Sequence, residues 1–498
     1  MKYVGIDLGT TNIKAGLYDE RLRRTALLSR PMRYRHVGTS VEFDAEYVLR
    51  CIVEMLRELG NRAAPISHIG LTGQAESLVL ASEDGRPVRP AISWMDERST
   101  VECAEIGARV STAELYVVTG QKAVIPTWPA AKLLRLKRTE PEALEEARWF
   151  VMLKDYIAWR LCGVLAADKS IATFTLYFDI HQGQYWDKML DICGIEKGKL
   201  PPLTEPCQQL GPLDPKHEFA LGNAYEGTHL NIGTLDHFAA MFGTGNLSVG
   251  GLSESTGTVM AMAAMARLPL AGCECAALHY GPLKGSYVFL PVAESGGICL
   301  EWFRDRFLPG VSFTDIDATV AARGCDSAMR LLFLPDIAGV NAPEFDSNAC
   351  GVFFGLRVET DGYDMARAVM EGVALLLWRN MSEIENTGIK VHRIISSGGG
   401  AKSDLWLQIK ADICGLEVCV TKDTEAACLG AAMSAAVGAG LFASFQDAAN
   451  ACVVMEKSFK PSFAPSITAY YEAKKRGFHA LYTAMRSVRS AMSVQSIG

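Results

Sequence analysis

The sequence lacks an excess of basic residues, which removes one large class of function. Its 498 residues include 49 Lys and Arg against 56 Asp and Glu, a formal net charge of −7. No broad basic field is available to hold a nucleic-acid backbone, so we expect no nucleic-acid partner. With 49% hydrophobic and 21% charged residues the composition is that of a globular protein, which excludes disorder and collagen-like repetition.

Signals for secretion and for a disulfide framework are also missing. The chain starts MKYVGIDLGT, without the features of a signal peptide, and its 14 cysteines are scattered. Disulfide frameworks belong to short secreted domains, so we expect free buried thiols and a cytoplasmic protein. The closest pair, Cys273 and Cys275, has no second pair or histidine cluster nearby to complete a zinc site.

One uncharged stretch needs a membrane check. Residues Ala426 to Phe445 carry no charge, and their number is that of a spanning helix. The stretch is mostly Ala, Gly and Ser, however, and lacks the expected basic flanks. We expect a tightly packed helix at an internal cleft, and no membrane partner.

The familiar phosphate-binding loops are absent. There is no Gly-x4-Gly-Lys-Ser/Thr pattern, and no Gly-x-Gly-x-x-Gly turn follows the first strand. If a nucleotide binds, its phosphates must contact a different kind of loop.

Three glycine turns supply candidates for that loop. Strands predicted at 3–7 and 13–18 flank a tight turn at 8–11, and strands at 250–255 and 259–262 flank Thr256-Gly257-Thr258. A third strand at 391–397 runs into Gly398-Gly399-Gly400-Ala401 and a helix at 403–414. Such turns let backbone N–H groups approach a phosphate closely. Alternatively, the first turn is a plain hairpin and the third a packed strand-to-helix crossover.

Strands and helices alternate along the chain, which indicates an α/β protein. A helix is predicted from Asp44 to Leu59, ending at Gly60, a strand at 68–72, and a last helix at 467–488. The length suggests about three domains, and two large ones also fit. A boundary is expected near residues 245–255.

The first turn has the chemistry of a phosphate site. Gly9 opens the backbone, Thr10 and Thr11 add hydroxyls and amides, and Lys14 adds a cation. Asp7, at the end of the strand, is placed to hold the water shell of a magnesium ion.

Several separated motifs are spread over most of the chain. They are GIDLGTTNIKAG (5–16), GLTGQAE (70–76), ISWMDERS (92–99), LKDYIAWRLCG (153–163), GTLDHFAAMFGTG (233–245), STGTV (255–259), SGGICLEWFRD (295–305), GVFFGL (351–356) and SSGGGAKSDLWLQIKADICGLEV (396–418). Together, and in this order, they resemble one family, the FGGY carbohydrate kinases, from Lys2 to about Ser444.

The resemblance implies an α/β fold of two actin-like (ribonuclease H-like) ATPase domains flanking a deep catalytic cleft. We expect an N-terminal domain at 1–248 with the sugar site and first phosphate turn. A C-terminal domain at 249–455 would carry the second phosphate turn and the adenosine site, and 456–498 a helix and tail.

The implied activity is ATP-dependent phosphorylation of a hydroxyl of a neutral sugar or polyol. Asp236 matches the catalytic base of the family, although as a sequence feature it also fits a helix N-cap. The resemblance assigns substrate contacts to the following residues: Gln74, Glu76, Trp94, Asp96 and His237. Trp94 alone would more often be a core residue, and His237 fits equally well as a supporting or solvent-facing residue.

The cofactors implied are ATP and Mg²⁺, although the pocket residues do not exclude GTP. Asp7 and Asp236 are expected to hold the magnesium ion through water. Nucleotide contacts are assigned to Gly9, Thr10, Thr11, Lys14, Thr258, Gly297, Gly400, Ala401 and Asp404.

Departures from the family pattern leave the sugar open. Ala75-Glu76 replaces the Met-His or Arg-Glu found in relatives, and His237 stands where Asn or Gln is more usual. Glu-Arg-Thr-Pro reads Val340-Asn341-Ala342-Pro343, and Gly-Thr-Ser becomes Gly257-Thr258-Val259. The space at Ala75 suits a larger or differently branched sugar.

Two other functions stay open on the sequence. The same turns would serve an actin-like ATPase that moves a partner, or a non-catalytic sensor of sugar or nucleotide. The substrate set favours the kinase, since such machines have no use for it. The resemblance also raises the expectation of a homodimer.

Overall fold

The computed structural model describes residues 1–213, 221–267, 276–325, 330–340, 346 and 349–492. The chain forms two compact units. The first contains Met1–Leu247, Met265–Val288 and Glu425–Val453, and the second contains Ser248–Ala264, Phe289–Thr424 and Val454–Gly498. Two later segments of the chain therefore return to the first unit, whereas the predicted domains were contiguous.

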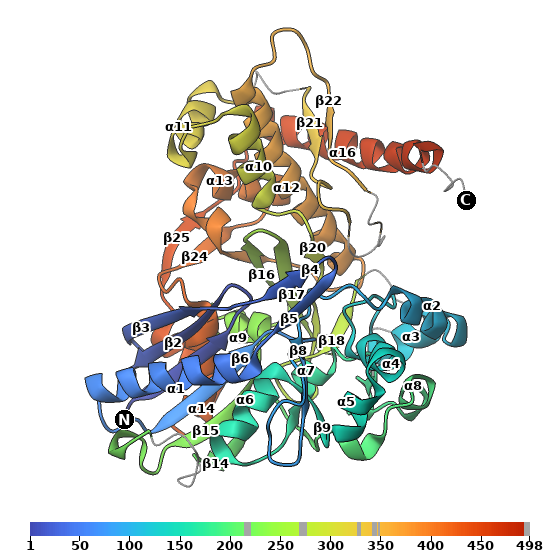
Figure 1. Cartoon of the computed structure of the whole chain (residues 1–498). Coiled ribbons are helices and arrows are strands. Elements are labelled where there is room, and N and C mark those ends of the chain that lie inside the picture. Colours follow the sequence, from blue (N-terminus) through green and yellow to red (C-terminus); the bar gives the residue numbers. More distant parts are fainter. Residues whose placement is uncertain (214–220, 268–275, 326–329, 341–345, 347–348, 493–498) are drawn as a thin grey trace. The chain divides into compact units, whose positions relative to one another are not determined.

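A six-stranded sheet forms the centre of the first unit (Figure 1). Its order is β14 (Gln209–Pro212), β15 (His229–Leu235), β6 (His68–Gly73), β1 (Tyr3–Leu8), β2 (Asn12–Tyr18) and β3 (Arg24–Pro31). β1 pairs antiparallel with β2 and parallel with β6, which in turn pairs parallel with β15.

Alternation along β1 assigns the two faces of this sheet. Val4, Ile6 and Leu8 belong to a core shared with α1 (Ala45–Arg62) and α6 (Leu153–Cys162). Tyr3 on the opposite face packs with α14 (Ala426–Gly438). A Cβ on Gly5 would lie 1.9 Å from the carbonyl oxygen of Cys428, so this face requires glycine. Asp7 follows on the same face.

The uncharged stretch at 426–445 is divided between two helices. α14 ends at Gly438, and α15 (Phe445–Cys452) begins at the last residue of the stretch. The small residues of α14 let it approach β1, β6 and α9 (Asp236–Gly243); a Cβ on Gly430 would lie 1.8 Å from the oxygen of Ala239. Among the described residues, no helix is long and apolar enough to cross a membrane.

The predicted C-terminal end of the first helix is wrong. Asp44 caps α1 as its pattern indicates, accepting from the N–H of Glu46, but the helix continues through Gly60 to Arg62. A Cβ on Gly60 would lie 2.8 Å from the ring of Tyr225. This glycine serves close packing and does not terminate the helix.

The rest of the first unit surrounds this sheet. A second sheet contains β4 (Arg35–Val37), β5 (Ser40–Phe43), β8 (Ala91–Ile92), β7 (Leu78–Ala81) and β9 (Trp149–Met152). The short strand pairs are β10 (Ala167–Asp168) with β13 (Leu203–Thr204) and β11 (Phe178–Asp179) with β12 (Gln184–Tyr185). β18 (Leu278–Tyr280) and β19 (Tyr287–Phe289) are instead the outer strands of an eight-stranded sheet. The remaining helices are α2 (Thr100–Arg109), α3 (Thr112–Thr119), α4 (Pro129–Thr139), α5 (Pro141–Glu146), α7 (Lys169–Ala172) and α8 (Asp187–Cys193).

The second unit repeats the pattern of a hairpin followed by two parallel strands. β17 (Met260–Ala266) and β16 (Gly251–Thr256) are antiparallel, and β23 (Arg393–Ser397) and β24 (Val418–Thr421) continue the sheet in parallel to β16. β25 (Met455–Phe459) pairs with β24, and β20 (Val292–Ala293) with β17. The Asp7–Thr11 turn and the Thr256–Thr258 turn therefore occupy equivalent places in two similar sheets.

Helix α12 (Gly362–Glu385) is the long central helix of the second unit. It packs against α10 (Ile298–Phe307), α11 (Phe313–Arg323), α13 (Asp404–Cys414) and α16 (Pro465–Met492) (Figure 1). β21 (Leu332–Leu334) pairs with β22 (Val352–Phe354) beside it. All cysteines among the described residues are free thiols, whereas Cys273, Cys275 and residues 341–343 lie outside that range.

Candidate active site

The hairpin of β1 and β2 places five of the predicted residues together. Asp7 and Lys14 are direct partners across the antiparallel pair, and Gly9 lies at the tip. A Cβ on Gly9 would lie 2.9 Å from the oxygen of Asn12 and 3.7 Å from Asp7 Oδ2. Thr10 is half-buried and Thr11 is exposed, so the tip can be approached from solvent.

Asp236 lies close enough to this turn to affect the pKa of Asp7. Burial raises the pKa of Asp7 to about 8, with further increases from the charges of Asp236 and Glu425 and a decrease from Lys14. Asp7 Oδ1 is buried and has no hydrogen-bond partner among the described residues. An acceptor oxygen without a donor, beside a second carboxylate, is an arrangement that a cation would stabilise.

Glu425 is a member of this cluster that the sequence did not reveal. Lys14 Nζ lies 2.6 Å from Glu425 Oε2, although 411 positions separate the two residues. Burial lowers the pKa of Lys14, but the hydrogen bond and charge of Glu425 outweigh it, and the net shift is upward. The lysine is therefore held as a cation beside Asp7. Glu425 precedes α14, and no local pattern marks it.

Asp236 begins helix α9 and does not cap it. The N-cap is Leu235, and Asp236 Oδ1 accepts from the N–H of His237 at 2.7 Å. The alternative interpretation of Asp236 as an N-cap is therefore wrong. Its carboxylate is half-buried at the N-terminus of the helix.

Gln74 and Glu76 lie on the loop after β6. Gln74 is 4% exposed, and its Nε2 is buried without a partner among the described residues. Glu76 has a positive φ of 61°, which is uncommon outside glycine and often accompanies function. The backbone oxygen of Glu76 accepts from Lys132 Nζ at 2.9 Å.

Lys132 joins this loop to the one that carries Trp94. The side chain lies on α4, is 1% exposed, and donates a second hydrogen bond to the oxygen of Ser93 at 2.8 Å. Burial lowers its pKa to about 8, with the charges of Glu76 and Asp96 opposing the shift. The sequence offered no sign of this buried lysine, because α4 reads as an ordinary amphipathic helix.

Trp94 is a partly exposed residue at the first turn, and not a core residue. Its Nε1 donates to Thr10 Oγ1 at 3.1 Å, so the indole connects the predicted sugar loop to the predicted phosphate turn. His237 is also half-buried, and its charge acts on the pKa of the buried His279.

Asp96 is held entirely by protein groups. It is 1% exposed and accepts from the N–H of Val41 at 2.9 Å and from the guanidinium of Arg98 at 2.7 Å. Arg98 in turn binds Glu42 at 2.8 Å. The geometry favours a structural role for Asp96 over the predicted sugar contact.

In the second unit the glycine turns converge on Thr256. Gly297 N donates to the oxygen of Gly257 at 2.6 Å, and Gly296 N to the oxygen of Thr258 at 2.9 Å. A Cβ on Gly400 would lie 2.8 Å from Thr256 Cβ. Residues from three distant parts of the chain therefore surround one strand end.

The three consecutive glycines have different requirements. Gly398 has a φ of +79° and Gly400 packs against Thr256, so both are explained by the crossover. Gly399 is exposed, and a Cβ there would have no close neighbour, so packing does not require it. Ala401 follows in the same turn, and its N–H donates to the oxygen of Gly398 at 3.3 Å. Asp404 begins α13 and pairs with Lys457 at 2.7 Å on the surface.

A buried ion pair lies directly beneath this turn. Lys410 Nζ lies 2.5 Å from Glu254 Oε1 and 3.0 Å from Thr256 Oγ1, and both charged side chains are fully buried. Thr256 Oγ1 donates to Glu254 Oε2 at 2.7 Å, and Ser396 donates to Oε1. This network holds β16, β23 and α13 together behind the glycines.

Comparison with known proteins identifies the class. The family model for the N-terminal domain of the FGGY family of carbohydrate kinases matches residues 2–243, and the model for the C-terminal domain matches residues 300–439. Xylulose kinase of Bacillus subtilis (strain 168) is 31% identical over 471 residues, 93% of either chain. The chain belongs to the FGGY family of carbohydrate kinases.

Solved structures agree with this assignment. A ligand-bound xylulose kinase from Lactobacillus acidophilus matches at a TM-score of 0.91 and 25% identity, over 99% of this chain and 100% of that one. A gluconate kinase from the same organism matches equally well, over 99% of each chain. The expected fold of two actin-like domains is confirmed. The protein is a phosphotransferase that acts on an alcohol group of a small sugar substrate with ATP.

Proposed function

We propose that this kinase phosphorylates a hydroxyl of a neutral sugar or polyol, with Asp236 as the general base. The observation that carries the proposal is the position of Asp236 close to the buried Asp7, whose pKa its charge raises, beside the Gly9–Thr11 turn. Phosphoryl transfer depends on positioning and on neutralising charge, with a carboxylate to accept the hydroxyl proton. Asp236 is half-buried at the start of α9, so its carboxylate can meet a substrate hydroxyl.

The donor atoms around Asp7 suit Mg²⁺. Carboxylate oxygens are the ligands that this ion prefers, and it usually keeps several waters, so few protein ligands are needed. Asp7 and Asp236 would hold the ion through water. Its positive charge would favour ionised Asp7 and so oppose the increase in pKa that burial causes. When bound, the ion neutralises phosphate oxygens.

The sugar would be held by Gln74, Glu76, Trp94 and His237. Gln74 Nε2 is a buried donor in want of an acceptor, which a sugar hydroxyl would supply. The indole of Trp94 offers an apolar face to the C–H surface of a sugar. Lys132 and the Asp96–Arg98 pair do not contact the sugar in this proposal, but they hold these loops in position through hydrogen bonds and an ion pair.

Each unit has a glycine turn with groups that suit a nucleotide. In the first unit, Gly9, Thr10, Thr11 and Lys14 offer backbone N–H groups, hydroxyls and one cation to the phosphates. In the second unit, the corresponding groups belong to Thr258, Gly297, Gly400, Ala401 and Asp404. The exposed Gly399, which packing does not require, supports close approach of a ligand to this turn.

Relatives named for xylulose and gluconate match this chain, so the substrate is best tested over a panel. We expect a pentulose or hexulose to exceed glycerol, because Ala75 leaves space beside Glu76. ADP release from Mg-ATP would be measured with pentuloses, hexuloses, aldonates and polyols of three to six carbons. Glycerol as the best substrate would contradict the argument from Ala75.

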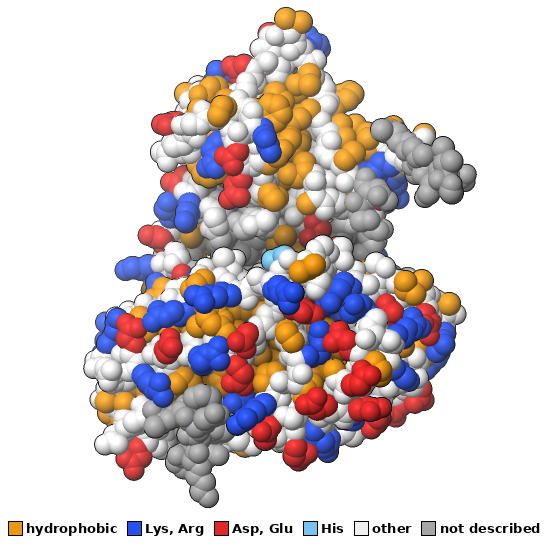
Figure 2. Space-filling view, in the orientation of Figure 1, with side chains coloured by type: hydrophobic (Ala, Val, Ile, Leu, Met, Phe, Trp, Pro, Cys, Tyr) orange, Lys and Arg blue, Asp and Glu red, His pale blue; other side chains and the backbone are white. Residues whose placement is uncertain are grey.

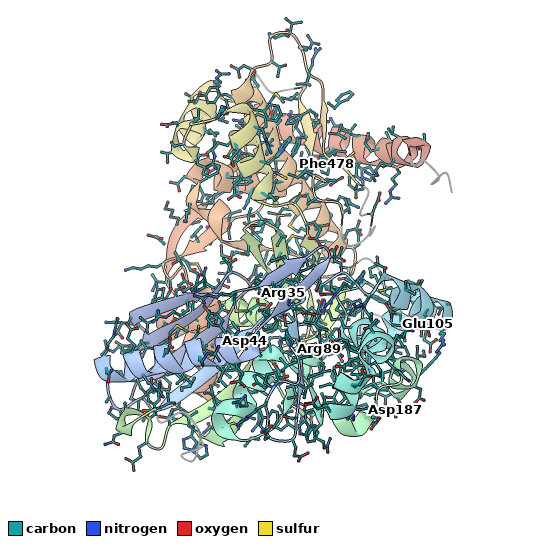
Figure 3. The ribbon with its side chains drawn as sticks, in the orientation of Figure 1. Arg35, Asp44, Arg89, Glu105, Asp187 and Phe478 are labelled. Atoms are coloured by element: carbon teal, nitrogen blue, oxygen red, sulfur yellow. The ribbon has the colours of Figure 1, made fainter. Side chains whose placement is uncertain are left out.

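The base is tested with Asp236→Asn. Loss of the general base should lower kcat by at least about a hundredfold while nucleotide binding survives. Asp187→Asn, an equivalent change at the exposed start of α8, is the matched control and should keep full activity (Figure 3). Sugar-stimulated turnover that persists in Asp236→Asn would refute the base assignment. Hydrolysis that no sugar stimulates would favour the actin-like ATPase or sensor.

A further inference from the structure

A cavity of about 590 Å³ lies outside the groups proposed for catalysis, between the β4–β5 hairpin and the loop before β8. Its volume is that of a site for a small organic molecule. The walls come from the following residues: Arg33, Tyr34, Arg35, Glu42, Phe43, Asp44, Ala45, Glu46, Pro87, Arg89 and Pro90. None of the residues proposed to bind sugar or nucleotide lines it. All residues of the cavity wall belong to the first unit.

Arg89 is the buried polar group of this cavity. Its side chain is 8% exposed; Nε donates to Glu140 at 2.8 Å and Nη2 to Glu42 at 2.6 Å. The third nitrogen, Nη1, is buried and has no hydrogen-bond partner among the described residues. A guanidinium nitrogen left without an acceptor in a buried position costs free energy, which an anionic ligand would recover.

The other basic side chains of the cavity have free charges. Arg33 stacks on the ring of Tyr47 at 4.7 Å, and Arg35 is exposed on β4; neither has an ion-pair partner among the described residues. Figure 3 labels Arg35, Asp44 and Arg89 on these neighbouring elements. Basic side chains also border an exposed hydrophobic area on this face of the first unit (Figure 2).

The acids of the cavity are already neutralised by other arginines. Glu42 binds Arg98 as well as Arg89, Asp44 binds Arg50 at 3.0 Å, and Glu46 binds Arg160. Burial raises the pKa of Glu42, but the two arginines outweigh it and lower the pKa overall, so this carboxylate stays ionised and paired. An incoming anion therefore meets the free charges of Arg33 and Arg35, and the guanidinium of Arg89 belongs to the same wall.

We propose that this cavity is a second ligand site, separate from the active site, for a small organic oxyanion. The ligand would carry a carboxylate or phosphate for Arg35, Arg33 and Arg89 Nη1. Its apolar body would lie against Tyr34, Phe43 and the two prolines, because most of the cavity wall is apolar. Arginine suits both groups, since its planar fork binds either oxyanion through two N–H donors.

Isothermal titration calorimetry with benzoate and with phenylphosphate tests the site and separates the two headgroups. Binding of either probe to the wild-type protein, weakened at least about tenfold by Arg35→Gln, is the expected result. Arg21→Gln removes the same charge from an exposed turn elsewhere in the first unit and should leave binding unchanged. Arg89→Lys keeps the charge but loses the fork, and it should weaken binding further still.

Three outcomes would overturn the proposal. The first is no heat of binding at about 10 mM probe, a concentration well above the range of specific small-ligand sites. The second is equal binding by the wild type and Arg35→Gln. The third is displacement of the probe by an accepted sugar, which would assign the probe to the substrate pocket. Arg35 is exposed and makes no ion pair with described residues, so its variant folds even if Arg89→Lys does not. The binding arms need no turnover, so they stand even if the kinase proposal fails.

Discussion

Replacing Lys410 by Met should destabilise the second unit more than any surface change on the same sheet. Methionine has nearly the same length, so it fills the space but removes the charge 2.5 Å from Glu254. The carboxylate then stays fully buried, with only the hydroxyls of Thr256 and Ser396 as donors. Breaking a buried pair in this way costs about 3–5 kcal/mol, because one charge is left uncompensated.

A second substitution should recover much of that loss. Glu254→Gln combined with Lys410→Met removes both charges, while the amide oxygen still accepts from one of the two hydroxyls and the amide N–H donates to the other. We expect the double variant to be more stable than Lys410→Met by about 2 kcal/mol, the size of coupling usual for groups in one network. The surface control is Lys457→Met, which breaks the exposed pair with Asp404 and should have no measurable effect.

Hydrogen exchange read by mass spectrometry is the suitable assay, since a chain of two units need not unfold in one step. Lys410→Met should speed exchange in β16, β23 and α13, with little change in the sheet of the first unit. The reasoning fails if the double variant loses as much as the two single variants added together. Unchanged exchange in Lys410→Met would contradict it equally.

The remaining predictions concern pH and the sugar loops. Burial lowers the pKa of His279 to about 3, with a smaller contribution from His237. The folded protein keeps this ring neutral, whereas the unfolded chain protonates it below about pH 6.5. The free energy of unfolding therefore keeps its full value above about pH 6.5 and falls below that pH, by about 2 kcal/mol at pH 5. Urea unfolding at pH 7 and pH 5 should show this loss, and His279→Gln should reduce it; an identical loss in the variant would exclude His279 as the cause. Lys132→Met removes both hydrogen bonds between the loops of Glu76 and Ser93 and should raise the KM for sugar about tenfold. The KM for ATP should change less than about twofold; parallel increases in both would indicate general unfolding instead.

Local patterns were sufficient for the turns and most of the strands. The hairpin around Gly9, the hairpin around Gly257 and the strand before Gly398 are marked by β-forming runs that end in Gly and Thr, and these signals lie within a few residues. The end of α1 was predicted wrongly because it depends on a contact with a residue that is distant in the sequence. Gly60 looks like a terminator, but its lack of a side chain is required by Tyr225, a residue far along the chain.

Roles that depend on burial could not be read from neighbouring residues. Asp96 looked like a polar ligand beside Trp94, yet in the fold its oxygens are used by Val41 and Arg98. Lys132 received no role from the sequence, yet it is buried and donates to the backbone oxygens of Glu76 and Ser93. Whether a polar group faces solvent, a ligand or another side chain is decided by elements that meet only after folding.

The sequence by itself determined the family, the α/β class and the positions of the glycine turns, because these depend on motifs of neighbouring residues and on backbone freedom that glycine alone provides. Only the tertiary structure decided which charges meet. Lys14 reaches Glu425, Glu254 reaches Lys410, and Arg89 keeps one buried nitrogen without a partner. Electrostatic interactions and desolvation act through space and depend steeply on distance and burial, so separation along the chain carries no information about them.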